Sequence, residues 1–288
     1  MTQALYRKYR PKQWDTVLGQ DHVVQTLTNA IKANRVGHAY LFAGPRGTGK
    51  TTVARLLAKA VNCLNEDSAQ RPDNTCEHCK AVNENRFMDL IEIDAASNTS
   101  VDDIRDLREK INFSPSQGKY KIYIIDEVHM LSTAAFNALL KTLEEPPPHA
   151  IFVLATTEIH KIPATVLSRC QRHEFRRVPI DEIVANLKEI IKAENIQADD
   201  EALTLIARQS AGGMRDAQSL LDQLASTGTK ITLALAQQVL GTATSQTVLD
   251  IIASILDHQP ARGLETIHHA LDTGADPRSL APQLVEYT

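Results

Sequence analysis

A glycine-rich octapeptide offers the most specific chemistry in this sequence. Residues 44–51 read Gly-Pro-Arg-Gly-Thr-Gly-Lys-Thr and fit the pattern G-x-x-x-x-G-K-[ST], between a short apolar run and a helical pattern. Glycines let successive backbone N–H groups face one anion, and the helix start behind them adds positive charge. In such a loop we expect Lys50 to reach the terminal phosphates of a nucleotide and Thr51 to ligate Mg²⁺. The predicted phosphate-binding residues are Gly44, Pro45, Arg46, Gly47, Thr48, Gly49, Lys50, Thr51 and Thr52.

Two carboxylates end a second apolar run. Asp126 and Glu127 follow Tyr-Lys-Ile-Tyr-Ile-Ile at 120–125, and ligands of open α/β sheets collect at the carboxyl ends of strands. We expect Asp126 to hold Mg²⁺, directly or through water, and Glu127 to polarise an attacking water. Two solvated carboxylates at a strand end are the alternative. Thr157 ends another apolar run and is expected to contact the γ-phosphate or that water, or else to act in a turn.

Two arginines are candidates for the extra positive charge that phosphoryl transfer needs. Arg169 lies between the fourth and fifth predicted strands, at a domain edge, where it could reach a phosphate bound by a neighbouring subunit. Arg215 opens a helix of the second predicted domain and could reach this chain's own nucleotide. An exposed arginine is usually a solvated charge, which is the alternative for both.

Residues 63–80 break the pattern of strands and helices with a polar excursion. It contains three of the four cysteines, Cys63, Cys76 and Cys79. Four cysteines in a cytoplasmic chain of this size argue against a disulfide framework, so metal binding or plain burial remains. Cys170, beside Arg169, is expected to be a small buried residue.

These residues need a scaffold that brings strand ends together. Short apolar runs predict strands, and apolar residues recur at helical spacing between them. Strands that alternate with helices imply a parallel sheet covered on both faces, so the first domain is expected to be α/β. The predicted strands cover 39–43, 89–93, 120–127, 151–155 and about 173–175.

After Pro179 the strand pattern stops and helical patterns follow. They predict a small all-helical second domain and the start of a third, whose helices are too few to enclose a core. The predicted domains are residues 1–178 with the excursion 63–80, residues 179–242, and residues 243–288, the last incomplete. The predicted helices of the second domain cover 180–194, 200–210, 214–226 and 232–240.

Composition narrows the class of protein. The chain has 288 residues, 43% of them hydrophobic and 23% charged, which is ordinary for a globular protein of two or three domains. Its formal net charge of −4 means that any contact with nucleic acid must use a local surface. The apolar runs are far shorter than a membrane span and the first residues lack the apolar core of a signal peptide, so we expect a cytoplasmic protein with no membrane contact.

Several blocks of sequence occur together and in order. Besides 44–51, these are Asp89-Leu-Ile-Glu-Ile-Asp-Ala-Ala-Ser97, Ile125-Asp-Glu-Val-His-Met-Leu131, Asn137-Ala-Leu-Leu-Lys-Thr-Leu-Glu-Glu-Pro-Pro147 and Leu167-Ser-Arg-Cys170. Together they closely resemble the tau/gamma subunits of bacterial DNA polymerase III, which are motor subunits of the sliding-clamp loader and AAA+ ATPases. The likeness runs over essentially the whole chain, and the last two blocks are far more specific than the glycine loop.

The resemblance implies a fold and an activity. It implies a P-loop AAA+ domain, a helical lid domain and the start of a helical collar, in an oligomeric ring or spiral with ATP at the subunit interfaces. ATP binding would let the assembly, with the other clamp-loader subunits, open the sliding clamp and grip primer-template DNA, and hydrolysis would release both. By the match, Arg169 is the finger that acts in a neighbour's site, Arg215 the lid-domain sensor and Thr157 the first sensor.

The resemblance also implies a Zn²⁺ site, with a departure from the family pattern. Relatives usually bind zinc through four cysteines after the P-loop helix. Cys63, Cys76 and Cys79 match, and Asp73 stands where the remaining cysteine is expected. Three thiolates and a carboxylate can complete a tetrahedral site, while His78 competes for the fourth place.

A second departure concerns DNA. Some relatives carry basic side chains in the loop that corresponds to 97–100, which here reads Ser-Asn-Thr-Ser. Contact with DNA phosphates would then use hydroxyls, amides and a helix start, without reading base sequence. Because neutral contacts release few counterions, we expect this chain alone to bind DNA weakly.

Two other functions fit parts of the pattern. One is a scaffold of the same fold that assembles a replication complex without hydrolysing ATP, although such a scaffold could have lost some of the residues that are all present here. The other is a motor that acts on DNA junctions, against which the Leu-Glu-Glu-Pro-Pro and Ser-Arg-Cys blocks speak. The sequence favours an ATP-hydrolysing clamp-loader subunit.

Overall fold

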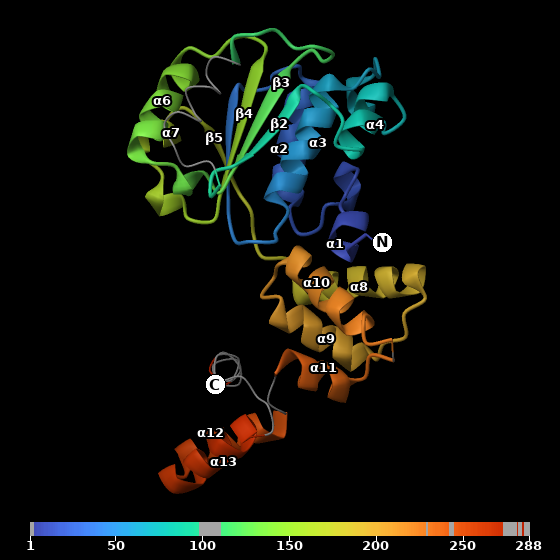
Figure 1. Ribbon diagram of the computed structural model, residues 1–288, viewed down its shortest axis with the longest axis vertical. Helices are drawn as coiled ribbons and strands as arrows, with labels where there is room; N and C mark the ends of the chain where they lie inside the picture. The colour runs from blue at the N-terminus through green and yellow to red at the C-terminus, as the bar shows by residue number, and fades with distance from the viewer. Residues whose placement is uncertain are drawn as a thin grey trace. The chain divides into compact units, whose positions relative to one another are not determined.

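The protein is described from a computed structural model (Figure 1). It describes residues 3–97, 111–228, 230–241 and 245–272, together with Ala281 and Leu284. The chain forms two compact units, Met1–Glu182 with Gly212–Asp216, and Ile183–Ala211 with Ala217–Thr288. Residues 98–110, which hold most of the loop expected to contact DNA and the helix start behind it, lie outside the described residues.

The first unit is built on a five-stranded sheet, as predicted. Its strand order is β2-β3-β4-β1-β5, and every neighbouring pair is parallel. The register aligns the carboxyl ends of the strands, because Ala43 lies beside Thr156 and Asp94 beside Asp126. The strands are β1 (Ala39–Ala43), β2 (Leu90–Asp94), β3 (Lys121–Asp126), β4 (Ala150–Thr156) and β5 (Gln171–Glu174).

Helices cover both faces of the sheet (Figure 1). On one face lie α2 (Asp21–Lys32) and α3 (Lys50–Asn62), and on the other α6 (Thr133–Glu144) and α7 (Ala164–Leu167). Successive strand residues point to opposite faces, so Leu41 packs in the core under α6 while Tyr40 and Phe42 pack in the core under α3. Because helices cover both faces of the sheet, its strands are apolar along almost their whole length.

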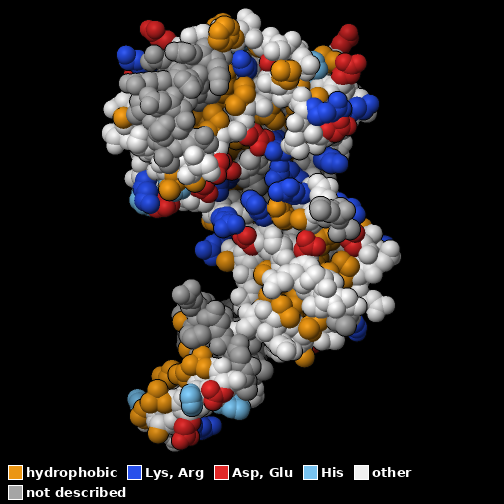
Figure 2. Space-filling model, viewed as in Figure 1, with side chains coloured by type: hydrophobic (Ala, Val, Ile, Leu, Met, Phe, Trp, Pro, Cys, Tyr) orange, Lys and Arg blue, Asp and Glu red, His pale blue; other side chains and the backbone are white. Residues whose placement is uncertain are grey.

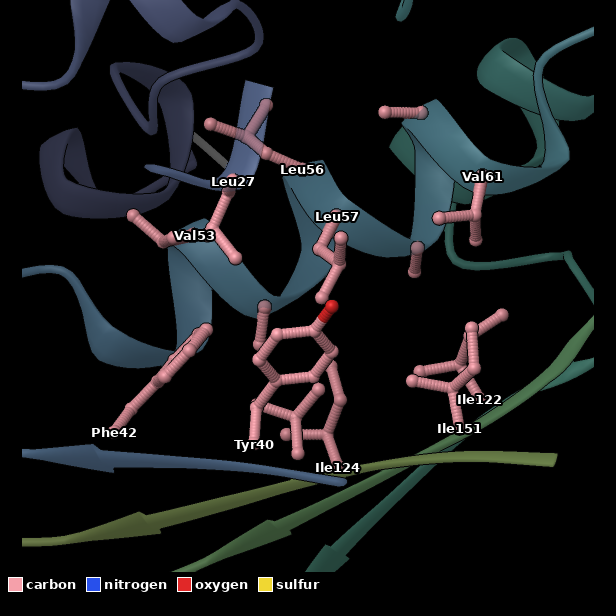
Figure 3. Packing of buried hydrophobic residues seen from close by; sticks show 14 of the residues in the cluster. Leu27, Tyr40, Phe42, Val53, Leu56, Leu57, Val61, Ile122, Ile124 and Ile151 are labelled. Atoms are coloured by element: carbon pink, nitrogen blue, oxygen red, sulfur yellow. The ribbon is translucent and has the colours of Figure 1, made fainter. Parts of the chain in front are cut away.

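The core beneath α3 is closely packed (Figure 3). Val53, Leu56 and Leu57 of α3, with Leu27 of α2, are at most 1% exposed. They pack against side chains of the sheet, among them Tyr40, Phe42, Ile122, Ile124 and Ile151. Full burial of one such side chain contributes about 1.5–3 kcal/mol. The helix that follows the glycine loop is therefore firmly attached to the sheet.

Several short elements escaped prediction. They include α1 (Leu5–Lys8) and α4 (Glu77–Asn83), which begins inside the polar excursion. Gln20 precedes α2 as its N-cap residue. The short 3-10 helices are η1 (Trp14–Thr16), η2 (Ser68–Gln70), η3 (Val128–Met130) and η4 (Ile159–Lys161).

After β5 the described residues are mainly helical, as predicted. Its helices are α8 (Ile180–Glu194), α9 (Asp200–Gln209), α10 (Met214–Ala225), α11 (Leu233–Leu240), α12 (Ser245–Leu256) and α13 (Pro260–Asp272). Large apolar side chains are exposed on α12 and α13, namely Leu249, Ile255, Leu256 and Leu264. Figure 2 shows hydrophobic side chains gathered in this region. No helix within the described ranges has both the length and the apolar character needed to cross a membrane.

Asp89 is a buried carboxylate just before β2. It is 0% exposed and accepts backbone N–H groups from Ser116, Gln117 and Gly118, each at 2.7 Å. These three bonds join the segment that leads into β3 to the start of the neighbouring strand. They help to set the register on which the strand ends depend.

We expect Asp89→Asn to lower the free energy of unfolding by about 2–3 kcal/mol, because charge-assisted bonds are lost and an amide donor faces N–H groups. Asp15→Asn, at an exposed residue of η1, is the matched control and should change it by less than about 0.5 kcal/mol. Urea unfolding followed by circular dichroism measures both. Equal effects of the two substitutions would contradict this role of Asp89.

Candidate active site and metal centre

The loop between β1 and α3 has the geometry that its glycines predict. The Gly44 N–H donates to the Thr156 carbonyl oxygen at 3.2 Å, so the loop begins beside the end of β4. A Cβ on Gly44 would overlap the carbonyl oxygen of Phe175. Gly49, just before α3, has a φ of 101°, which side-chain-bearing residues rarely adopt. Glycine is therefore required at both positions.

Lys50 is a buried cation at the start of α3. It is 6% exposed, and its Nζ donates to the carbonyl oxygens of Gly44 and Pro45, both at 2.8 Å. Burial lowers the pKa of Lys50, and the carboxylates of Glu127 and Asp126 oppose that shift. The ammonium group thus lies within the loop and in the field of both predicted catalytic carboxylates.

Thr51 and Asp126, the two predicted magnesium ligands, are in contact. The Thr51 hydroxyl donates to Asp126 Oδ2 at 2.8 Å, and Asp126 Oδ1 accepts the Glu127 N–H at 3.0 Å. A hydroxyl and a carboxylate at a phosphate-binding loop form the oxygen donor set that Mg²⁺ prefers. The residues present therefore fit this cation.

Glu127 is held by the end of the neighbouring strand. Its backbone is left-handed, with φ 46° and ψ 46°, a conformation that costs a non-glycine residue of order 1 kcal/mol and clusters at functional sites. Its Oε2 accepts two hydrogen bonds from Thr157, from the N–H at 3.2 Å and the hydroxyl at 2.9 Å. The predicted first sensor and the predicted water-orienting residue are thus direct partners.

His129 belongs to the same cluster, although the sequence assigned it no role. Its side chain is 6% exposed and its Nδ1 lies 3.4 Å from Glu127 Oε2. The same nitrogen is 3.0 Å from the Thr156 hydroxyl, and Nε2 is 3.3 Å from Glu158 Oε1. The 3-10 turn η3 brings the ring to the end of β4, and no spacing rule in the sequence signals such a turn.

The remaining loop residues are more peripheral. The Thr48 hydroxyl donates to the Pro45 carbonyl at 2.8 Å and so helps to close the loop. The Arg46 side chain is 74% exposed and lies 4.0 Å from the Asp216 carboxylate. Thr52 is half-buried in the first turn of α3.

The two predicted arginines have partners within the chain. The backbone N–H of Arg215 donates to the Gly47 carbonyl at 3.4 Å, and its guanidinium lies over the Tyr6 ring, 4.8 Å from the centroid. Arg169 pairs with the Glu144 carboxylate and donates to the Thr165 carbonyl at 2.6 Å. Arg215 therefore adjoins the loop directly, whereas Arg169 lies on α7's carboxyl side, beside the end of α6.

A basic cavity of about 530 Å³ opens in the first unit. No pattern in the sequence predicted this cavity. Among the described residues that line the cavity, one is acidic. This residue is Glu92, and Arg55 donates to its carboxylate at 2.6 Å. Burial and the charge of Arg55 lower the pKa of Arg10. The basic residues of the wall are Arg7, Arg10, Lys12, Arg55, Lys59 and Arg215. This excess of positive charge favours an anionic occupant.

The polar excursion folds its cysteines and Asp73 into one cluster. The ligand atoms of Cys63, Asp73, Cys76 and Cys79 all lie within 4.8 Å of one another. Cys63 Sγ and Cys76 Sγ are 3.9 Å apart, close to the separation of about 3.8 Å that tetrahedral ligands at the usual zinc–sulfur distance would have. The donor set and its spacing therefore fit Zn²⁺.

His78 does not belong to this cluster of ligand atoms. Its Nδ1 lies 2.7 Å from the Asn62 carbonyl oxygen, and its ring packs beside Phe87 with centroids 5.3 Å apart. Asp73 instead accepts backbone N–H groups from Thr75 and Cys76; against the effect of burial, these bonds lower the pKa of Asp73 and favour its carboxylate. Of the two competing fourth ligands, Asp73 is the one placed beside the thiols.

Cys170 lies apart from the metal cluster. It is half-buried against the core under α6, and burial raises the pKa of its thiol to about 11. All four cysteines are free thiols.

Three family models match consecutive parts of the chain. Residues 19–179 match the DNA polymerase III delta subunit model, 182–230 the ATPase lid domain of a DNA polymerase III clamp loader subunit, and 231–288 domain III of DNA polymerase III subunits gamma and tau. The DNA polymerase III subunit tau of Bacillus subtilis is 49% identical over 286 residues, 99% of this chain. The chain belongs to the tau/gamma family of DNA polymerase III clamp-loader subunits.

Other members of the tau/gamma family are similar along the same length. The Escherichia coli subunit tau is 42% identical over 98% of this chain, and the Buchnera aphidicola subunit gamma is 44% identical over 88% of this chain and 68% of its own length. The chain spans 51% of the Bacillus subtilis and 44% of the Escherichia coli relative. Its likeness to tau therefore concerns about half of those proteins.

Solved structures show the AAA+ fold of this tau/gamma family member. The Thermotoga maritima RuvB Holliday junction branch migration motor superposes with a TM-score of 0.59 and 20% identity, over 97% of this chain and 91% of that one. At this identity the match concerns the fold alone. It agrees with the parallel sheet followed by helical domains.

Proposed function

We propose that this chain is an ATP-hydrolysing motor subunit of a sliding-clamp loader, which opens the clamp and places it on primer-template DNA. The observation that carries the proposal is the contact of Thr51 with Asp126 beside a P-loop, next to the contact of Glu127 with Thr157. Membership of the tau/gamma family supports it. A scaffold that did not hydrolyse ATP would have no need to keep these four side chains in contact.

In this proposal the loop and Lys50 bind the phosphates of ATP. Backbone N–H groups of the loop and the start of α3 face an anion there, and Lys50 can exchange its two carbonyl partners for phosphate oxygens. Mg²⁺, held by Thr51 and Asp126, would neutralise charge on the β- and γ-phosphates when bound. Arg215 approaches from the Gly47 side and responds to the same nucleotide.

Glu127 orients and polarises the water that attacks the γ-phosphate. Its side-chain hydrogen bonds and ion pair with the described residues involve Oε2, which leaves Oε1 to accept a hydrogen bond from that water. Thr157 connects the carboxylate to the end of β4, so a change at the γ-phosphate can reach Glu127 through this hydroxyl. Products are ADP and phosphate.

Arg169 supplies its charge to the ATP site of a neighbouring subunit. Its ion pair with Glu144 is half-exposed, with the two side chains 32% and 49% exposed. Exposed pairs of this kind contribute about 0–1 kcal/mol. Arg169 can therefore leave Glu144 for a phosphate at little loss.

Assembly and partners follow from the same proposal. The exposed apolar side chains of α12 and α13 are suited to contacts with other clamp-loader subunits in a collar. The sliding clamp and primer-template DNA are the proposed substrates of the assembled ring or spiral. The part of the predicted DNA surface at 98–110 lies outside the described residues.

A structural zinc ion is proposed for the excursion. Cys63, Asp73, Cys76 and Cys79 would hold it, closing the coordination shell with protein ligands as structural sites do. The ion would fix the excursion to the end of α3, since Cys63 directly follows that helix.

The first test of the function is Glu127→Gln. In the assembled complex of the full-length protein with its partner subunits, this variant should bind ATP with unchanged affinity and lose turnover by about 10²-fold or more, because the amide cannot polarise water. Steady-state ATPase assays with and without clamp and primed DNA measure it. In the wild type, clamp and primed DNA together should stimulate turnover. Turnover that survives in the variant would remove Glu127 from this role, and a wild type without turnover would favour the scaffold.

The second test is Arg169→Ala. We expect unchanged ATP affinity but turnover lower by about 10³-fold in the assembled complex, since a charge on the transferring phosphoryl group is lost. Arg172→Ala removes a nearby exposed arginine that pairs with Glu174, and should leave turnover within about twofold of the wild type. The wild-type chain alone should hydrolyse ATP poorly. Efficient hydrolysis by a monomer would rule out a finger from the neighbour.

The third test is metal analysis. Protein purified without chelator should contain one zinc per chain, and Asp73→Ala should lose most of it to a competing chelator while Asp73→Cys and His78→Ala keep it. Inductively coupled plasma mass spectrometry gives the stoichiometry. Well under half an equivalent in the wild type would contradict the zinc site, and loss in His78→Ala alone would reassign the fourth ligand.

A further inference from the structure

His129 lies between two carboxylates at the end of β4. Its ring is almost fully buried, with a side-chain exposure of 6%. Nδ1 faces Glu127 Oε2 at 3.4 Å and Nε2 faces Glu158 Oε1 at 3.3 Å. A neutral imidazole has one N–H, so it can donate to only one of these carboxylates, whereas the imidazolium can donate to both.

The hydroxyl of Thr156 completes the surroundings of Nδ1. It lies 3.0 Å from that nitrogen and accepts the Glu158 N–H at 3.0 Å. An ionised carboxylate offers acceptors only, so an N–H on Nδ1 suits the place between Glu127 and Thr156. His129 therefore adds a donor on the oxygen of Glu127 that Thr157 also contacts.

We propose that His129 is a positioning residue for Glu127. It acts with Thr157 to hold Oε2, and thereby keeps Oε1 directed to the attacking water. The inference rests on the proposed function, in which Glu127 orients that water. The left-handed backbone of Glu127 makes such support necessary, because a residue in a sparsely populated conformation keeps it only where its surroundings impose it.

The other ring nitrogen, Nε2, contacts Glu158, which has a further partner of its own. Glu158 lies two residues after the end of β4, and its carboxylate also contacts Lys161 at 2.8 Å. The hydrogen bond from Lys161, and then its charge, lower the pKa of Glu158 and so favour its ionised, acceptor form. Through His129, the segment after β4 and the turn after β3 are joined at the carboxylate of Glu127.

Substitutions of His129 test the inference in the assembled full-length complex. His129→Ala should lower kcat for ATP hydrolysis by about ten- to hundredfold, as loss of an orienting partner does, while the Kd for ATP stays within about twofold. Asparagine places an amide nitrogen near the position of Nδ1, so His129→Asn should recover most of the lost kcat. Glutamine places it near Nε2, so His129→Gln should remain low. If His129 only stabilised the fold, the Asn and Gln variants would not differ in kcat in this way.

His160→Ala is the matched control. His160 contacts Glu158 at 3.5 Å but its side chain is 73% exposed, and it makes no contact with Glu127 among the described residues. Its removal should leave kcat within about twofold of the wild type. Thermal unfolding of each variant shows whether a low kcat reflects loss of folding. If His129→Ala fails to assemble, the comparison of Asn with Gln decides.

A double-mutant cycle separates this inference from the proposed function. In single-turnover assays, adding His129→Ala to Glu127→Gln should lower the rate no further, since the partner of His129 is already neutral. If the two substitutions instead lower the rate independently, so that their effects multiply, positioning is contradicted. It is also contradicted if Glu127→Gln is inactive while the kcat of His129→Ala stays within twofold of the wild type. Turnover that survives Glu127→Gln itself would instead overturn the proposed role of Glu127.

Discussion

The hydrogen bond between Thr51 and Asp126 is the contact on which the candidate active site depends. Thr51 lies in the first turn of α3 and Asp126 at the end of β3, two strands away from the β1 strand that leads into the loop. The bond, 2.8 Å long, can form because the parallel register brings all strand ends to one edge. A slip of one residue between strands would turn Asp126 to the other face of the sheet and separate the pair.

The helix that carries Thr51 also connects the two candidate sites. α3 begins at the glycine loop and ends next to Cys63, so the phosphate loop and the metal cluster occupy its two ends, about 20 Å apart for thirteen residues. Near its second end Lys59, 2% exposed, donates to the Lys12 carbonyl and to the amide oxygens of Asn74 and Asn83. Burial lowers the pKa of Lys59 to about 8. This buried cation fixes the excursion to α3 independently of any metal.

Most of the scaffold could be predicted from the sequence, whereas the finest contacts could not. Apolar runs and helical spacing predicted the five strands and the main helices, because burial on two faces imposes those patterns. The same patterns contain no signal for a 3-10 turn such as η3, so His129 received no role despite standing two residues after Glu127. For the fourth metal position the sequence left Asp73 and His78 open; in the structure Asp73 lies among the three thiols, whereas His78 contacts the Asn62 carbonyl oxygen. The basic cavity joins residues from 7 to 215, and no local pattern links positions so far apart.

The proposed catalytic groups differ in how firmly this chain holds them, and the difference bears on assembly. Arg169 and Glu144 form a half-exposed pair that water can replace on both sides, so in the proposed motor the arginine can leave Glu144 for a neighbour's phosphate at little loss. Glu127 has three contacts on one oxygen and a left-handed backbone, and its histidine partner is almost fully buried. Moving Glu127 would leave the partly buried N–H and hydroxyl of Thr157 without their acceptor, which is less favourable than breaking an exposed ion pair. In the proposed motor, the carboxylate is therefore set before subunits meet, and the step that completes the site is the arrival of the arginine.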